Sequence, residues 1–361
     1  MRLVMIGSSI LAAGLLALAA SMVAAAKTLD KAGTRTDVRT GHAAAAGGAT
    51  STMQSYAGVK PQNAQQLAKA HVPYPATLPP VPEGDVVKVR MVMKDKSVEI
   101  APGVTYNVWA FDGDMSAPGP VVHVRQGQTV EMTLVNGGAI PHSIDFHAAR
   151  IAPNVAFRDV APGESFTFRF AAGDPGVFMY HCGTKPVLAH IANGMYGAIV
   201  VDPATPLPKA DREYVLVASE WYLNGDGIAE PASLDLAKAH AMTPDWTAFN
   251  GYANQYVTHP LTADPGDLVR FYVVDAGPSL TTAFHVVGTV FDRVYPNGDM
   301  NPQHSQSGVQ TVDVPAGGGA VFEVKIDEPG RYPFVSHAFA HVDLGQVGLL
   351  KVGNPAGSMS H

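Results

Sequence analysis

The chain has 361 residues and a formal net charge of -7 at pH 7, and 47% of its residues are hydrophobic. It has no basic block that would favour nucleic acid, while its mild acidity allows a positively charged protein partner. The 36 glycines and 28 prolines favour short strands and turns over long helices.

Residues 1–26 have the pattern of a signal peptide, with Arg2 before an apolar run and small residues up to Ala26. An uncleaved anchor is the alternative, although the apolar run is short for a membrane span. No later segment offers eighteen consecutive apolar residues, so we expect no membrane span in the mature chain. The expected location is periplasmic or otherwise exported.

Residues 27–82 are rich in small and polar residues and lack an apolar period, which predicts a flexible low-complexity tail. His42 and His71 lie there and are interpreted as solvated bystanders rather than ligands. The rest of the chain is too long for one comfortable core. We therefore expect two domains, at residues 83–205 and 206–355.

Short apolar runs alternate with turn signals through both halves, a rhythm typical of β-sandwiches. This pattern predicts an all-β fold. The predicted strands are residues 121–124, 129–134, 165–170 and 177–180 in the first half, and 214–218, 268–274, 319–326 and 332–335 in the second.

The two halves share an order of short motifs, which predicts two tandem copies of one sandwich. Counting from a Pro-Gly pair in each half, Ser336 occupies the position of Cys182, so the second copy has lost the thiol. The shared motifs are Gly127–Val130, His142, Ala161–Gly163 and Pro175–Phe178 in the first copy, and Gly266–Val269, His285, Val314–Gly317 and Pro329–Tyr332 in the second.

Cys182 is the only cysteine, so it is either a buried apolar filler or a metal or redox thiol. The loop that follows it supplies an imidazole at His190 and a thioether at Met195. A blue copper site needs two imidazoles, one thiolate and a weak axial thioether. His142 is the well-placed second imidazole, so we predict a type 1 copper site formed by these four residues.

A second set of histidines faces away from the first, because residues an odd number apart in a strand lie on opposite faces. This rule separates His147 from His142, and His181 from Cys182. A catalytic metal held by three imidazoles keeps a fourth position open for substrate. His337 follows a strand of the second domain and is the best third ligand, although a lone histidine there is often structural.

At this point the chain resembles the copper-containing nitrite reductases, over about residues 85–352. The resemblance implies two tandem cupredoxin-like Greek-key β-sandwich domains, two coppers per subunit and a homotrimer. The motifs that carry it are His-Ser-Ile-Asp-Phe-His at 142–147, Met-Tyr-His-Cys at 179–182, His-Ile-Ala-Asn-Gly-Met-Tyr-Gly at 190–197, Phe-His-Val-Val-Gly at 284–288, and Ser336-His337.

The resemblance also implies how these residues are shared between subunits. The type 1 copper would be held within one chain, and electrons would pass from it to the type 2 copper through Cys182 and His181. A cupredoxin or a c-type cytochrome would be the electron donor, in denitrification. The type 2 copper would be held by His147 and His181 of one subunit and His337 of the next.

Asp145 and His285 would be the acid–base pair of the type 2 site. The chemistry asks for such a pair by itself, because reducing nitrite to nitric oxide consumes one electron and two protons and releases water. Asp145 could instead orient a histidine ligand, and His285 could be a hydrogen-bonded core histidine.

Two departures from the family pattern leave alternatives open. Val287 stands where the family often has isoleucine, so the pocket over the type 2 copper would be wider. His341 follows His337 in a stretch one residue shorter than usual, so either could be the ligand, and His337 is favoured because it directly follows the strand.

Two other classes compete with the reductase. A multicopper oxidase would need a cluster built from four His-x-His pairs, and the chain has no such pair. An electron-transfer cupredoxin would bind one copper per chain rather than two.

Overall fold

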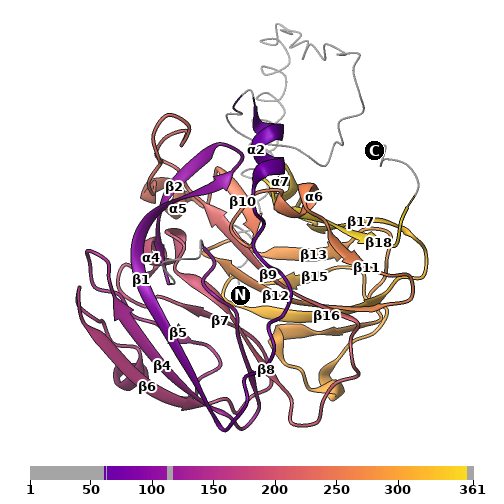
Figure 1. Ribbon diagram of the computed structural model, residues 1–361, viewed down its shortest axis with the longest axis horizontal. Helices are drawn as coiled ribbons and strands as arrows, with labels where there is room; N and C mark the ends of the chain where they lie inside the picture. The colour runs from indigo at the N-terminus through magenta and orange to yellow at the C-terminus, as the bar shows by residue number, and fades with distance from the viewer. Residues whose placement is uncertain (1–60, 62, 112–116, 356–361) are drawn as a thin grey trace, which may run out of the picture. The chain divides into compact units, whose positions relative to one another are not determined.

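The computed structural model describes residues 61, 63–111 and 117–355 (Figure 1). The expected signal peptide, and most of the expected tail including His42, lie outside these residues. The described part is built from β-sheets with a few short helices, which confirms the predicted all-β class. No helix in this part is long and apolar enough to cross a membrane.

The first sandwich consists of two four-stranded sheets. In one, the long strand β1 pairs with β2 in antiparallel and with β4 in parallel orientation. In the other, the strand order β3-β8-β7-β5 places β7 at the centre. The strands are β1 (Val86–Ala101), β2 (Val104–Ala110), β3 (Val122–Arg125), β4 (Thr129–Asn136), β5 (Asp145–Phe146), β6 (Ser165–Ala171), β7 (Gly176–His181) and β8 (Tyr196–Asp202).

The second sandwich consists of two five-stranded sheets, in the orders β10-β9-β12-β16-β14 and β11-β18-β17-β13-β15. The eight predicted strands all appear, with ends that differ by a few residues. The strands are β9 (Arg212–Trp221), β10 (Trp246–Phe249), β11 (Leu261–Ala263), β12 (Leu268–Gly277), β13 (Thr282–Val286), β14 (Arg293–Tyr295), β15 (Val312–Val314), β16 (Gly319–Lys325), β17 (Gly330–Ser336) and β18 (Val347–Val352).

Strand β12 shows how the two sandwiches join. Phe271 and Val273 belong to the core of the second sandwich, whereas Tyr272 and Val274 belong to a core shared with the first. A strand covered on both faces is apolar throughout instead of alternating. β7 packs against β12 and β16, so the strand that leads into Cys182 lies directly on the second sandwich.

Short helices fill the connections between strands. Two of them carry histidines, because His190 lies on α4 and His341 lies on α7. The helices are α2 (Ala64–Ala70), α3 (Pro153–Ala156), α4 (Val187–Ala192), α5 (Leu236–Ala241), α6 (Gln255–Thr258) and α7 (Phe339–Asp343), with 3-10 turns η1 (Pro296–Gly298) and η2 (Pro302–His304).

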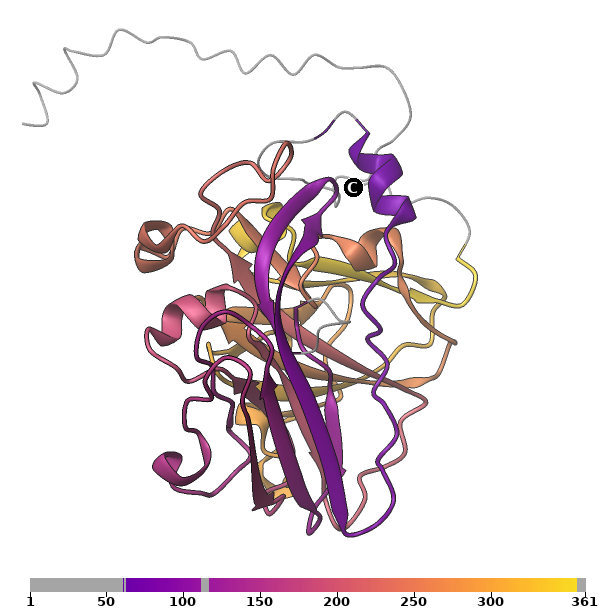
Figure 2. The same cartoon turned by 60° about the vertical axis from the view of Figure 1, so that its left-hand side comes forward.

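The segment before β1 differs from the expected flexible tail. Residues 64–70 form α2, which contacts α6, and Figure 2 shows the chain running from α2 down to the start of β1. Tyr74 is buried against the body of the protein. Its backbone N–H donates to Gln255 Oε1 at 2.7 Å, and its hydroxyl donates to Gly119 O at 2.9 Å. The prediction of a tail was therefore wrong for residues 63–82.

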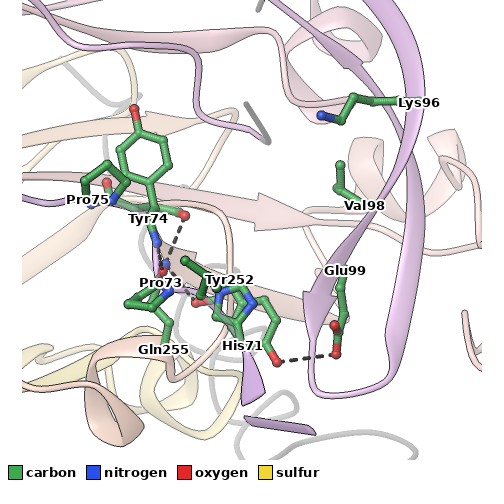
Figure 3. Close-up of a pocket in the computed structure, with 11 residues that line it drawn as sticks. His71, Pro73, Tyr74, Pro75, Lys96, Val98, Glu99, Tyr252 and Gln255 are labelled. Atoms are coloured by element: carbon green, nitrogen blue, oxygen red, sulfur yellow. Dashed lines mark hydrogen bonds between the residues drawn. The ribbon is translucent and has the colours of Figure 1, made fainter. Parts of the chain in front are cut away.

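His71 is likewise not a solvated bystander. Its ring stacks on Tyr252, with centroids 3.6 Å apart, beside a cavity of about 410 Å³ (Figure 3). Burial, followed by the nearby His259, lowers the pKa of His71 to about 4. Composition alone missed this segment because its few apolar residues dock on a distant surface rather than forming a local core.

Candidate metal centres

His142, Cys182 and His190 converge in the first sandwich and are all buried. Their candidate ligand atoms lie within 4.8 Å of one another, and no other group of three or more His, Cys, Asp or Glu in the described residues does so. His190 Nδ1 lies 3.2 Å and His142 Nδ1 lies 3.9 Å from Cys182 Sγ. The two Nδ1 atoms are 3.1 Å apart. The structure thus brings three of the four predicted type 1 residues together.

The local fold positions these three side chains from different elements. Cys182 directly follows β7, and His190 lies on α4, with seven residues between the two along the loop. His142 forms an isolated bridge with Val160. The ring of Trp109 packs against both imidazoles, with centroid distances of 5.4 Å to His142 and 4.8 Å to His190.

Met195, the fourth predicted residue, closes the same loop and is fully buried. Its backbone N–H donates to His190 O at 3.2 Å, and its carbonyl accepts from Cys182 N at 3.1 Å. These two bonds return the chain to the thiol side of the pocket, and Met195 shares an apolar cluster with Cys182. The segment from Cys182 to Met195 therefore forms a loop whose two ends are hydrogen-bonded to each other.

The chemistry of this pocket fits a soft metal ion. Burial lowers the pKa of His142 to about 3 and also lowers the pKa of His190, so both rings are neutral and offer lone pairs near neutral pH. His142 Nε2 is buried without a hydrogen-bond partner, which leaves Nδ1 as the atom directed at the thiol. Burial raises the pKa of the Cys182 thiol, against hydrogen bonds led by that from Ser143 N, so a bound cation would have to displace its proton.

A second pair of imidazoles lies on the other side of the same strand. The Nε2 atoms of His147 and His181 are 3.0 Å apart. His147 Nδ1 donates to Gly317 O at 3.0 Å, and His181 Nδ1 donates to Cys182 O at 2.9 Å. Because each Nδ1 carries the proton, two Nε2 lone pairs face each other. A cation between them relieves this repulsion, so the pair fits a metal site.

Asp145 lies beside this pair, because β5 pairs with β7 so that Asp145 is opposite His181. Burial, followed by the charge of His181, lowers the pKa of His147, while Asp145 acts in the opposite direction. The carboxylate is half-buried, so it is reachable from the surface that carries both imidazoles. Its position suits either a proton carrier or a group that tunes a ligand.

His337 does not join His147 and His181 within one chain. It lies on the surface of the second sandwich, where its N–H donates to Ala283 O at 2.6 Å. Its ring instead neighbours that of His285, with centroids 5.6 Å apart, and that of Phe339, with centroids 4.8 Å apart. His285 Nδ1 donates to Gln310 O at 2.5 Å, so the other ring nitrogen, Nε2, takes no part in this bond. Besides the buried His142 and His190, the described part of one chain thus carries two separate histidine pairs near its surface, one on each sandwich.

His341 occupies a different environment from His337. It is buried on α7 and its Nδ1 lies 3.1 Å from Ser336 Oγ. Burial lowers its pKa. An internal histidine cannot reach a neighbouring subunit, so the geometry favours His337 over His341 as a ligand shared between chains. Val287, which directly follows β13, is exposed.

The segment from His142 to His147 departs from the geometry expected of it. Only Asp145 and Phe146 form a strand, so the alternation of faces along one strand does not explain the placement of these histidines. The two rings still diverge, because His142 turns to Cys182 while His147 turns to His181. The strand rule applied to His142 and His147 therefore does not hold here, although the two histidine groups are separate.

The second sandwich repeats the frame of the buried pocket with other side chains. Ala283 N donates to Ser336 Oγ at 3.3 Å, as Ser143 N donates to Cys182 Sγ at 3.3 Å. Gln346 Nε2 donates to Thr282 Oγ1 at 2.8 Å, and the backbone carbonyl of Gln346 accepts from Ser336 N at 3.4 Å. Thr282, Ser336, His341 and Gln346 therefore correspond to His142, Cys182, His190 and Met195. The match of His285 to His142 expected from the repeat was wrong, because Thr282 occupies that position.

Several contacting residues have no signal in the sequence. Trp109 and Gln310 reach these groups from segments far away along the chain and belong to none of the motifs. Gly317 ends the repeat motif Val314–Gly317, but nothing in that motif points to His147. Only Ser143, which lies next to His142, is close enough in sequence to be suspected.

Comparison with protein families gives two matches that together span both sandwiches. Profiles described as Multicopper oxidase match residues 92–206 and 228–356. The copper-containing nitrite reductase of Neisseria gonorrhoeae is 41% identical over 272 residues, which cover 74% of this chain and 68% of that protein. The copper-containing nitrite reductase of Pseudomonas chlororaphis is 31% identical over 291 residues, which cover 74% and 78%.

Solved structures give the same picture. A copper nitrite reductase from Nitrosomonas europaea matches with a TM-score of 0.69 and 39% identity, over 74% of this chain and 94% of that one. A Cu-containing nitrite reductase from Thermus scotoductus matches with a TM-score of 0.68 and 30% identity, over 74% of this chain and 62% of that one.

Proposed function

The chain belongs to the copper-containing nitrite reductase family and is a copper-dependent oxidoreductase that reduces nitrite, and we propose that it does so with two copper centres per subunit. The observation that carries the two-centre proposal is the peptide bond between His181 and Cys182. The thiol faces the buried pocket, and the imidazole faces His147. A simple electron carrier needs no second group of imidazoles, and this alternative is not favoured.

The buried pocket would hold the type 1 copper through His142, Cys182, His190 and Met195. Two neutral imidazoles and a thiol converge there in a site closed to solvent. Soft sulfur ligands stabilise the reduced state of copper, and a rigid pocket suits electron transfer. Rigidity is supplied by the packing of Trp109 and by the loop bonds of Met195.

The type 2 copper would be held by His147 and His181 of one subunit and His337 of the next. Each chain presents one histidine pair on each sandwich, and these pairs do not meet within the chain. A head-to-tail ring brings the second sandwich of one subunit to the first of its neighbour and closes by rotation. Resemblance to the family suggests that the ring has three members.

Copper in the shared site would supply one electron and a polarising charge to nitrite. The chain itself must supply two protons, because nitrite, one electron and two protons give nitric oxide and water. Asp145 lies beside the imidazole pair of the first sandwich, and His285 lies beside His337 in the second. A ring that joins the sandwiches would place this carboxylate and imidazole on either side of the substrate. They would then hold and deliver the two protons.

The cellular setting is also part of the proposal. The signal-like residues 1–26 support export to the periplasm, where such an enzyme would serve denitrification. The electron donor would be a small cupredoxin or c-type cytochrome, and the net charge of -7 allows a positively charged one.

Anaerobic turnover with nitrite and an artificial electron donor tests the activity directly. A copper-loaded sample should produce nitric oxide and contain two coppers per chain. Fully loaded protein that produces no nitric oxide would refute the activity. Nitric oxide production with a single copper per chain would refute the two-centre arrangement.

A further inference from the structure

The imidazole of His147 is oriented by the other sandwich of the same chain. Its Nδ1 donates to the carbonyl of Gly317 at 3.0 Å, across 170 residues of sequence. A backbone carbonyl that receives Nδ1–H fixes the tautomer and the direction of Nε2. The position of the turn at Gly317 therefore decides where Nε2 of His147 is directed.

This turn is tied to Asp275 at the end of β12. Gly317 N donates to Asp275 O at 2.7 Å, and Asp275 N donates to Gly318 O at 3.0 Å. Gly317 has a φ of +79°, and a Cβ added there would lie 3.5 Å from Cε1 of His147. The turn thus needs glycine for its conformation and has the ring as its nearest neighbour.

The side chain of Asp275 extends the connection to the second histidine pair. The carboxylate is buried and accepts from Gly277 N at 2.8 Å and from Thr282 N at 2.7 Å. Thr282 begins β13, the strand that carries His285. Asp275 therefore fixes the start of the strand that presents one proposed catalytic residue, while its backbone holds the turn that orients a proposed ligand.

The first sandwich uses the same frame without this role. Gly163 N donates to Asn136 O at 2.7 Å, and Asn136 N donates to Glu164 O at 2.9 Å. There, however, Nδ2 of Asn136 donates to the carbonyls of Ile140 and Val160, and no described histidine is bonded to Gly163. Because both sandwiches have these backbone bonds, the bonds themselves serve the fold. Within the described residues, only the second sandwich adds a carboxylate, that of Asp275, which accepts from two N–H groups, and a turn whose carbonyl accepts from His147.

We propose that Asp275 is a positioning residue of the type 2 centre, acting through the Gly317 carbonyl on His147 and through the start of β13 on His285. This role rests on the proposed function, because it requires His147 to be a copper ligand. An amide at position 275 could accept only one of the two N–H groups and would turn its own NH₂ toward the other. The loop from Gly277 to Thr282 and the turn at Gly317 should then shift together.

Copper binding to the protein stripped of metal provides the test. In Asp275→Asn we expect the second copper to bind about 10-fold to 100-fold more weakly, as when outer partners of metal ligands are removed. Its electron paramagnetic resonance signal should also change. The visible absorption of the type 1 site should be kept, since that site lies in the first sandwich. Asp327→Asn, an exposed acid of the second sandwich, is the matched control and should match wild type.

Gly317→Ala is the second variant, and it perturbs the turn while leaving the side chain of Asp275 unchanged. If Asp275→Asn also loses the visible absorption, the result for Gly317→Ala decides between the alternatives. Weaker binding of the second copper in Gly317→Ala supports the proposal, and binding as tight as in wild type overturns it. Wild-type affinity and an unchanged resonance signal in both variants would overturn the positioning role alone. A wild-type protein that binds only one copper per chain would overturn the proposed function, and this role with it.

Discussion

His285 on β13 and His337 directly after β17 lie side by side, with ring centroids 5.6 Å apart, while His147 and His181 face each other in the other sandwich. Under the proposed function, these two pairs are the two halves of one site that is completed between chains. Histidines exposed in pairs on separate sandwiches are expected when a site forms only between chains. The first prediction follows from this separation.

Mixing two inactive variants should restore activity. His337→Ala subunits keep the His147/His181 face, and His147→Ala subunits keep His337. In a ring of three containing both variants, one interface joins the two intact halves and two do not. We therefore expect nitric oxide production to return after dissociation and reassembly. Absence of activity in verified mixed trimers would show that the ligands come from a single chain.

Replacing Cys182 by Ser should remove the intense visible absorption of the type 1 site. A hydroxyl gives no thiolate-to-copper charge transfer, whereas the second group of imidazoles is untouched. Metal analysis should still find one copper per chain, and turnover should collapse. Colour retained in this variant would contradict the assignment of the buried pocket.

Replacing Asp145 by Asn, or His285 by Asn, should lower turnover by on the order of a hundredfold while both coppers remain bound. Each change keeps a similar size and some hydrogen bonding but removes a group that can exchange a proton. The exposed His240→Asn variant serves as the control and should turn over normally. Normal turnover in both site variants would mean that protons reach nitrite by another path.

The repeated frame in the second sandwich predicts that a blue copper site can be built there. Thr282→His, Ser336→Cys and Gln346→Met would complete the set with His341. These changes are best made together with Cys182→Ser, so that any visible thiolate absorption arises from the new pocket. The control carries only Ser336→Cys in the same Cys182→Ser background and should stay colourless. If the full set also stays colourless with a folded protein, the likeness of the two frames does not extend to side-chain geometry.

His71 should make the protein less stable in mild acid. Its pKa is about 4 when folded, against 6.5 for an unperturbed histidine, so the unfolded chain binds the proton first. The stability that the neutral ring contributes is complete above about pH 6.5 and is lost as the pH falls toward 4.

His71→Phe keeps a ring to stack on Tyr252 and removes the titrating group. Between pH 7 and pH 5, we expect the Tm of this variant to fall less than that of wild type. The exposed His240→Phe should fall like wild type. Equal falls in all three proteins would show that His71 does not contribute to the acid sensitivity.

Local patterns were enough to predict the all-β fold, the eight strands and the buried pocket. Alternating apolar residues report a half-buried strand whichever partner covers it. Cys182, His190 and Met195 lie on one loop, so their spacing reflects their geometry directly. The match of Ser336 to Cys182 was also visible from the repeat, and the paired bonds of Ala283 and Ser143 confirm it.

The tertiary structure decided what depends on contacts between distant segments. Only the fold brings Gly317 to His147 and packs residues 63–82 onto the body, because hydrogen bonds across 170 residues leave no local pattern. Only the fold separates His337 from His147 within a chain while placing it beside His285. The sequence by itself indicated which residues are candidate copper ligands, and the packing of two sandwiches decided which of them can meet.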